Sequence, residues 1–214
     1  MPGNATGNFN GKGWKTENLF TSRNKCSTIT TSLRRKKGII VRGRQWACSF
    51  TGHRPAKLPW GYREEDPRCL LLKRRIRDAV EAAYQEGYRH FLCGMAMGCD
   101  LYFCECVLAM RSRHADVTVE AVLPCPEQAD TWPEAERQRY RALVSACDDE
   151  TMVAQRYTAG CMQRRNRYLV DHAALLIAAY DGSAGGTRNT IQYALSQGVQ
   201  IADLPIPTEF PETV

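Results

Sequence analysis

The chain has 214 residues, of which 43% are hydrophobic, and this suffices for one globular domain with or without a tail. No apolar run reaches the ~18 residues that a membrane-spanning helix needs, so we expect no membrane partner. The net charge is +6, but residues 1–45 carry +9 and the remainder carries −3. This distribution argues against polyanion binding by the bulk charge of the folded part.

Residues 1–45 have the composition of a basic tail. Ten of them are Lys or Arg and one is acidic, and Gly, Asn, Thr and Ser are frequent among the rest. Such a segment buries too little apolar surface to offset the entropy of ordering, so we expect it to be disordered or loosely attached. Its basic cluster at 34–37 is compatible with nucleic-acid or membrane attraction. The composition favours a solubilising tail, or a start site assigned too far upstream.

From Trp46 onward, short apolar segments alternate with longer segments of helical periodicity. In chain order the pattern predicts strand 46–50, helix 67–86, strand 90–93, helix 100–113, strand 117–123, helix 133–147, strand 151–154, a helix from about 161, strand 173–180, helix 187–197 and strand 199–202. Asp66 and Pro67 form a helix start, and Gly87 forms a stop.

This alternation predicts an α/β domain over residues 46–204, followed by a Pro-rich end at 205–214. We expect a mostly parallel sheet with helices on both faces, which is a three-layer α/β/α sandwich. Ligands of such folds bind beyond the carboxyl ends of the strands. The loops that leave the strands there, 51–62, 94–100, 124–128 and 181–187, hold the glycines and the unusual polar residues. The ligand site is therefore expected at this edge.

The ten cysteines are scattered, and the N-terminus has no compact apolar stretch typical of a signal peptide. We therefore expect reduced thiols in a cytoplasmic protein. Cys99, Cys104 and Cys106 are close in sequence, but the last two face different sides of a predicted helix, and no His lies nearby. Buried structural thiols are the expectation, with neither a metal nor a cofactor.

The first loop begins with GHRP, residues 52–55. Gly52 permits a tight turn directly after the strand. Arg54 can place a forked guanidinium suited to phosphate at the sheet edge, and Lys57 adds a second charge. The alternative is an ordinary turn with a solvated Arg, and the tetrapeptide alone does not decide between them.

Three aromatic residues are candidates to stack on a base. Trp60, in LPWGY, ranks first because it follows GHRPAKL directly, ahead of Tyr62 and Trp132. Aromatic residues in loops serve as packing anchors as often.

The second loop, GMAMGCD, places Gly94 and Gly98 around a strand-to-helix turn, so N–H groups of the next helix can face an anion. Asp100 falls in the first helical turn. It can favour the helix dipole or cap the helix, or it can accept from a ribose hydroxyl.

In the helix from about 161, two polar residues interrupt an apolar stripe. Met162, Leu169 and Ala173 share one face, and Arg165 and Asn166 fall between them. These two side chains are either paired inside the fold or reach a ligand.

The last loop, DGSAGGT, follows the most apolar strand. Gly185 and Gly186 allow close backbone approach, and Thr187 is a candidate N-cap whose hydroxyl can also bind phosphate. Asp181 ends the strand. A capped turn explains the segment as well, but it is the third Gly turn at the same edge.

The motifs GHRP, LPWGY, GMAMGCD, PCPEQ, RRNRYLVD and YDGSAGGT, in this order, resemble the YpsA-like branch of the SLOG superfamily over residues 46–204. The resemblance implies a Rossmann-like fold and a nucleotide or nucleotide-derived ligand. Relatives include DprA/Smf, which binds single-stranded DNA, and the Lonely guy phosphoribohydrolases.

The enzyme relatives carry PGGxGTxxE, and their Glu falls on Thr190 here. Acid or base catalysis would need that carboxylate, so we expect a ligand-binding protein with a regulatory or sensor role rather than a hydrolase. Two alternatives stay open. One is an N-glycosidic hydrolase that uses Asp100, Glu105 or Asp181, and the other is single-stranded DNA binding as in DprA, through the basic tail and Arg54.

The expected partner is thus a nucleotide or nucleotide-derived small molecule. Binding of nucleic acid through the basic tail and assembly into a homo-oligomer both stay open. The expected ligand-binding residues are Gly52, His53, Arg54, Lys57, Trp60, Gly94, Met95, Gly98, Asp100, Arg165, Asn166, Asp181, Gly182, Gly185, Gly186 and Thr187.

Overall fold

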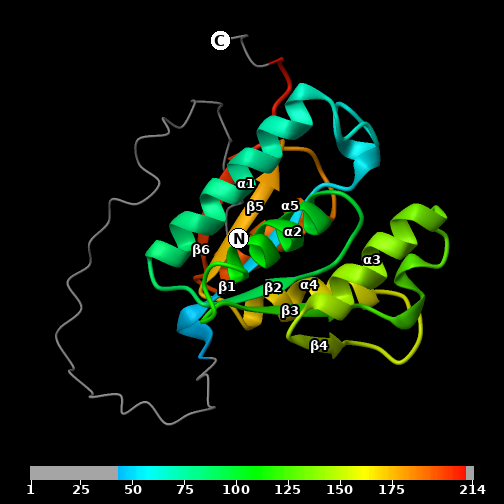
Figure 1. Ribbon diagram of the computed structural model, residues 1–214. Coiled ribbons are helices and arrows are strands. Elements are labelled where there is room, and N and C mark those ends of the chain that lie inside the picture. The colour runs from blue at the N-terminus through cyan, green and yellow to red at the C-terminus, as the bar shows by residue number, and fades with distance from the viewer. Residues whose placement is uncertain (1–42, 211–214) are drawn as a thin grey trace, which may run out of the picture. The chain divides into compact units, whose positions relative to one another are not determined.

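The computed structural model describes residues 43–210 (Figure 1). The tail predicted for residues 1–45 therefore lies outside the described residues, except for its last three. Within these, Arg44 begins a short 3-10 helix, η2 (Arg44–Trp46), and its Nε donates to the carbonyl of Ala173 at 3.2 Å.

Six strands alternate with five α-helices in this part of the chain, as the sequence predicts. The strands are β1 (Ala47–Gly52), β2 (His90–Cys93), β3 (Thr118–Leu123), β4 (Asp149–Met152), β5 (Leu175–Tyr180) and β6 (Gln200–Pro205). The helices are α1 (Pro67–Gln85), α2 (Cys99–Arg111), α3 (Glu134–Ala146), α4 (Cys161–Asp171) and α5 (Gly186–Ser196). The 3-10 helices η3 (Pro55–Lys57) and η4 (Pro126–Ala129) lie in the loops after β1 and β3.

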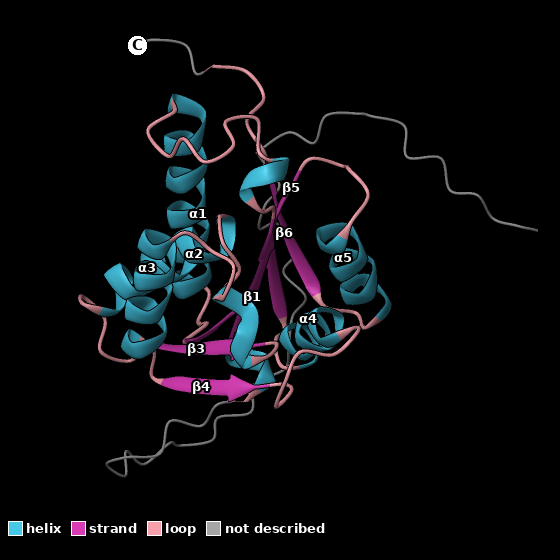
Figure 2. Cartoon of the chain, turned by 90° about the vertical axis from the view of Figure 1, so that its right-hand side faces the viewer, coloured by secondary structure: helices cyan, strands magenta, loops and turns pink. Residues whose placement is uncertain are grey.

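The strands pair in parallel throughout, in the order β4-β3-β2-β1-β5-β6. Helices α1, α2 and α3 cover one face of the sheet and α4 and α5 cover the other, as Figure 2 shows. The Rossmann-like α/β/α sandwich is therefore confirmed. The chain moves outward from β1 to β4 and then returns to β5 beside β1, so the strand order reverses between β1 and β5. Their carboxyl ends flank the usual place of a ligand crevice.

The sequence features that predicted these elements have direct structural counterparts. Side chains of the central strands β1 and β5 are buried along nearly their whole length, which is why both read as continuous apolar runs. Phe50 of β1 stacks on Phe103 of α2, with ring centroids 4.7 Å apart. Asp66 caps α1 by accepting from the Arg68 N–H at 2.9 Å, and Gly87 follows the helix with a φ of +101°. The predicted start and stop of α1 are confirmed.

Both edge strands differ from the prediction, and the bounds of the inner strands β1 and β5 shift by up to two residues. Strand β4 begins two residues earlier than expected, because DETM has no apolar run and is held through its backbone pairing with β3. Strand β6 ends three residues later than expected and includes Pro205, which pairs with Tyr180. Proline lacks an N–H group and is tolerated because β6 has a neighbour on one side only.

Candidate functional site

An open cavity of about 380 Å³ lies where the strand order reverses. The loop after β1, the first turn of α2 and the N-terminal halves of α4 and α5 border it. Nine of the sixteen predicted ligand-binding residues line it, namely Gly52, His53, Arg54, Lys57, Asp100, Arg165, Asn166, Gly186 and Thr187. Five lining residues were not among those predicted, namely Phe50, Thr51, Ala56, Ala96 and Met162. Their small or apolar side chains give no signal of a site in the sequence.

Arg165 and Asp100 form a buried ion pair at the floor of this cavity. Nη1 of Arg165 lies 3.1 Å from Oδ2 of Asp100, and each side chain is 6% exposed. The same carboxylate oxygen accepts from the Ala96 N–H at 3.1 Å. Burial raises the pKa of Asp100, although the charge of Arg165 opposes this. Of the two interpretations of Arg165, pairing inside the fold is therefore confirmed, and the pair also faces the cavity.

The guanidinium of Arg165 is not fully satisfied by this pair. Its Nε is buried and has no hydrogen-bond partner within residues 43–210. Gly94 gives the guanidinium its room, because a Cβ at Gly94 would lie 1.3 Å from Nη1 of Arg165. The absence of a side chain at this position is therefore a requirement of the buried pair.

Replacing Gly94 with Ala is expected to lower the free energy of unfolding by about 1–3 kcal/mol, because the added methyl group displaces Arg165 from Asp100. Gly186 provides the matched control, since a Cβ there would meet no atom within 4 Å. Gly186→Ala is expected to change stability by less than about 1 kcal/mol, in the stabilising direction. Urea unfolding of both variants measures the difference, and equal stabilities would contradict the assigned role of Gly94.

His53 is held on both sides of its ring. Its Nε2 lies 2.7 Å from Oδ1 of Asp181, and its Nδ1 lies 3.3 Å from the Thr187 hydroxyl. Burial alone raises the pKa of Asp181, but hydrogen bonds from the Ser183 N–H and from His53 lower it to about 2. An ionised carboxylate only accepts, so the N–H at Nε2 of His53 donates to Asp181. These contacts tie the loop after β1 to the loop after β5.

Helix α5 begins at Gly186, one residue earlier than predicted, and Gly185 is its N-cap. The prediction that Thr187 is the N-cap is therefore wrong, and its hydroxyl instead donates to the Gly52 carbonyl at 3.2 Å. No side chain of the described residues caps this helix. Its first N–H groups thus remain available to an anion in the cavity.

Two further cationic side chains approach the cavity from the loop after β1. The Nζ of Lys57 donates to the Ala184 carbonyl. The side chain passes close to Gly185, where a Cβ would lie 2.6 Å from this Nζ. Arg54 is exposed, and its Nη2 lies 3.8 Å from the sulfur of Met162. Together with Arg165, these residues place three positive charges around one cavity.

Thr190 is the residue on which the Glu of the resembled hydrolase motif falls. It is 3% exposed, and its hydroxyl donates to the Gly186 carbonyl and accepts from Nδ2 of Asn166, both at 2.9 Å. These bonds link α4 to α5 and fix the side chain of Asn166 beside the cavity.

The three aromatic candidates do not line the cavity. The structure buries Trp60, which is 2% exposed in the main apolar cluster, so its ring offers no free face to a base. The turn after η3 returns the chain to the core. The position of Trp60 shortly after GHRP in the sequence gave no sign of this burial. Tyr62 is 67% exposed, and Trp132 packs edge-on against Tyr140 at 5.3 Å.

Three other predicted residues shape the loops without lining the cavity. Gly98 has a φ of +93°, and a Cβ there would lie 2.9 Å from Cδ of Pro55, so the loops after β1 and β2 are in close contact. Met95 is fully buried with a φ of +55°, which is uncommon for a residue with a side chain. Gly182 has a φ of +90° in the loop after β5.

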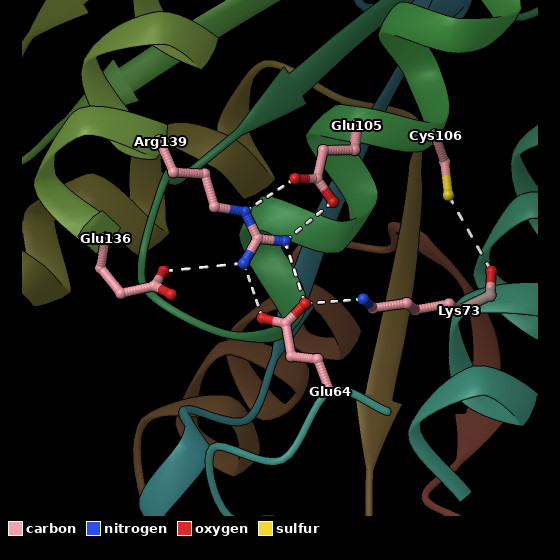
Figure 3. A network of polar contacts seen from close by, with 6 residues as sticks. All are labelled: Glu64, Lys73, Glu105, Cys106, Glu136 and Arg139. Atoms are coloured by element: carbon pink, nitrogen blue, oxygen red, sulfur yellow. Dashed lines mark hydrogen bonds and ion pairs between the residues drawn. The ribbon is translucent and has the colours of Figure 1, made fainter. Parts of the chain in front are cut away.

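Glu105, one of the acids considered for hydrolysis, lies elsewhere. It belongs to a network of polar contacts that Figure 3 shows, which joins α2 to α3 and to the loop before α1. Arg139 of α3 donates from Nε to Oε1 of Glu105 at 2.7 Å and from Nη1 to Oε1 of Glu64 at 2.6 Å. Lys73 also pairs with Glu64, at 2.6 Å. Glu105 does not line the cavity.

Within residues 43–210, no group of three or more His, Cys, Asp and Glu side chains is placed to hold a metal ion. None of the helices in this range combines the length and the apolarity needed to cross a membrane.

Comparisons with known proteins agree on one family. Residues 48–206 match the family model of YpsA, described as the YspA SLOG family. The chain is 28% identical over 143 residues to the uncharacterised SPbeta prophage-derived protein YoqJ of Bacillus subtilis, which covers 61% of this chain and 84% of YoqJ. It is 23% identical over 141 residues to the UPF0398 protein YpsA of the same organism. This alignment covers 65% of this chain and 78% of YpsA.

A solved structure supports the fold. DNA processing protein A (DprA) from Streptococcus pneumoniae aligns with a TM-score of 0.52 at 13% identity, over 77% of this chain and 52% of the DprA chain. At this identity the likeness concerns the fold alone. The family match, in contrast, spans 48–206 and therefore nearly all of the described residues. The chain belongs to the YspA SLOG family.

Proposed function

We propose that the cavity binds the phosphate end of a nucleotide or nucleotide-derived ligand, and that the protein acts as a regulator or sensor. The observation that carries this proposal is a convergence of donors. One cavity, at the point where the strand order reverses, is lined by the cationic residues Arg54, Lys57 and Arg165. The N-terminus of α5, which no side chain within residues 43–210 caps, borders the same cavity. Guanidinium groups and helix N-terminal N–H groups are strong phosphate donors. The buried, unpartnered Nε of Arg165 adds a donor in need of an acceptor.

The acidic groups support binding rather than cleavage. Asp100 is paired with Arg165, and Asp181 is held by His53 and the Ser183 N–H. Thr190, at the position of the hydrolase Glu, offers a hydroxyl that is already bonded twice. A general acid or base needs a carboxylate that can exchange protons with the ligand, and each acid near this cavity is already engaged.

Calorimetry of the full chain against nucleoside mono-, di- and triphosphates, dinucleotides and inorganic phosphate tests the proposal. At least one nucleotide is expected to bind in the micromolar range and to bind more tightly than phosphate alone. Native mass spectrometry of freshly purified protein is expected to detect a retained ligand. The proposal fails if no ligand binds at millimolar concentration and none co-purifies.

Arg54→Gln is expected to weaken the best ligand about 10- to 100-fold, the effect of one charge-assisted hydrogen bond. Arg77→Gln is the matched control, because Arg77 lies on α1 with a side chain that is 63% exposed and does not line the cavity. An equal loss in both variants would indicate a general charge effect and would contradict binding at this cavity.

The same protein preparations also test the two alternative functions, which are N-glycosidic hydrolysis and binding of single-stranded DNA. Release of free base from nucleoside monophosphates, lost in an Asp100→Asn variant, would replace the binding proposal with a hydrolase. Binding of single-stranded DNA with a steep salt dependence would favour the DprA-like alternative. Deletion of residues 1–42 then separates binding by the tail from binding by the domain.

A further inference from the structure

Two thiols lie close together on the face of the sheet that carries α1, α2 and α3, away from the candidate ligand site. The sulfurs of Cys104 in α2 and Cys147 at the end of α3 are 3.9 Å apart, although 43 positions separate them in the chain. Cys104 is fully buried and Cys147 is partly exposed. Of the two residues, Cys147 is therefore the one with exposed surface.

The two sulfurs are close to each other but not at bonding distance. A disulfide has an S–S distance of about 2.05 Å, so the sulfurs must approach by about 1.9 Å. Cys104 sits within α2, where its rotamers are restricted. Cys147 is the C-cap of α3 and has an extended backbone, with φ −68° and ψ 155°. Rotation about its Cα–Cβ bond would break the hydrogen bond that its sulfur donates to the Leu143 carbonyl, at 3.2 Å.

The surroundings of Cys147 favour the reactive thiolate. The hydrogen bond from the Cys104 thiol lowers the pKa of Cys147; burial opposes this and the charge of Arg111 supports it. The nearby carboxylates Asp148 and Glu150 act in the opposite direction. Asp148 is itself paired with Arg111 at 2.8 Å, which reduces its effect. Cys147 is thus the attacking thiol and Cys104 the resolving thiol.

We propose that Cys104 and Cys147 form a reversible disulfide when the folded protein meets a peroxide. The Cys147 thiolate attacks one oxygen of hydrogen peroxide, the O–O bond breaks, and the products are a sulfenic acid and, after protonation, water. The Cys104 sulfur then attacks the Cys147 sulfur, the S–O bond breaks, and a second water leaves. In total, two thiols and one peroxide give one disulfide and two waters, and a dithiol reductant reverses the change.

The test uses the full chain, reduced and then exposed to stoichiometric hydrogen peroxide, with free thiols blocked by N-ethylmaleimide. A protease that cleaves after Asp and Glu separates the relevant cysteines. Cys104 is the only cysteine of peptide 101–105, and Cys147 is the only cysteine of 137–148. Cys93 and Cys99 both fall in peptide 87–100, and Cys106 falls in peptide 106–116. We expect peptide 101–105 to be joined to peptide 137–148 by a disulfide. Treatment with dithiothreitol is expected to remove this cross-link.

Cys104→Ser and Cys147→Ser are each expected to abolish this cross-link. Cys106→Ser is the matched control and is expected to retain it, since the Cys106 sulfur contacts the Lys73 carbonyl rather than a thiol. Oxidation is also expected to raise the thermal midpoint by roughly 5–10 °C, because the link closes a long loop. A cross-link of peptide 101–105 to peptide 87–100, no cross-link in folded protein, or a lowered midpoint would overturn the proposal.

Discussion

Replacing Arg165 with Met is expected to lower the free energy of unfolding by about 3–5 kcal/mol, the usual effect of removing one partner from a buried ion pair. The variant leaves the carboxylate of Asp100 with one hydrogen bond, from the Ala96 N–H, in a site where both members of the pair are 6% exposed. Urea unfolding monitored by circular dichroism measures the loss.

Two further variants separate this mechanism from a loss of packing. Arg164→Met is the matched control, because Arg164 is the preceding residue of α4 and is exposed; its effect is expected to stay within about 0.5 kcal/mol. Adding Asp100→Asn to Arg165→Met removes the uncompensated charge and is expected to restore at least half of the lost stability. If the double variant is no more stable than Arg165→Met, the loss arises from packing and not from the charge of Asp100.

The pH dependence of Arg165→Met gives an independent test. Burial already raises the pKa of Asp100 in the folded protein, and removal of the opposing cation raises it further. A carboxyl group with a raised folded pKa binds more protons in the folded state, so stability falls as the pH rises through the range between its unfolded and folded pKa values. The deficit of Arg165→Met is therefore expected to shrink on acidification below neutral pH.

Much of the fold follows from local patterns. The apolar runs of β1 and β5, the Asp66 cap and the Gly87 stop each depend on residues close in sequence, and each is observed. The strand reversal then places the cavity, because the carboxyl ends of parallel strands share one edge. This explains why glycine-rich loops distant in sequence converge on the same site.

The remaining features depend on contacts between distant residues. The sequence presents Gly94 as a turn glycine, and only the tertiary structure shows that Arg165 fills the space of its missing side chain. Trp60 follows the GHRP motif closely, yet the turn after η3 places its indole in the core. Thr187 has the side chain of an N-cap, but the helix begins earlier and the hydroxyl bonds to the loop after β1.

A buried network on the α4 side of the sheet was also missed. Glu120 of β3 accepts from the His90 ring at 2.9 Å, from the Thr151 hydroxyl at 2.7 Å and from the Tyr168 hydroxyl at 2.9 Å. The signal that could have found it is a charged residue inside the apolar strand VTVEAVL. A buried carboxylate requires partners, and here they come from two neighbouring strands and one helix.

Glu120→Gln is expected to lower the free energy of unfolding at pH 7 by about 2–3 kcal/mol. Burial alone raises the pKa of Glu120, but hydrogen bonds from His90, Thr151 and Tyr168 lower it from 4.5 to about 2. Because the folded pKa lies below the unfolded one, this stabilisation is complete above about pH 5 and is lost as the pH falls towards 2. In Glu120→Gln, the decline of stability between pH 5 and pH 2 is therefore expected to be shallower.

Glu150→Gln is the matched control, because Glu150 is an exposed residue of the neighbouring edge strand β4. It is expected to keep both the stability at pH 7 and the acid dependence within about 0.5 kcal/mol. Some acid sensitivity remains in Glu120→Gln, since Asp181 also has a pKa of about 2 in the folded protein. Parallel curves of stability against pH for Glu120→Gln and the unmodified chain would mean that the pKa of Glu120 is the same in the folded and unfolded states, and the network would then not depend on its charge.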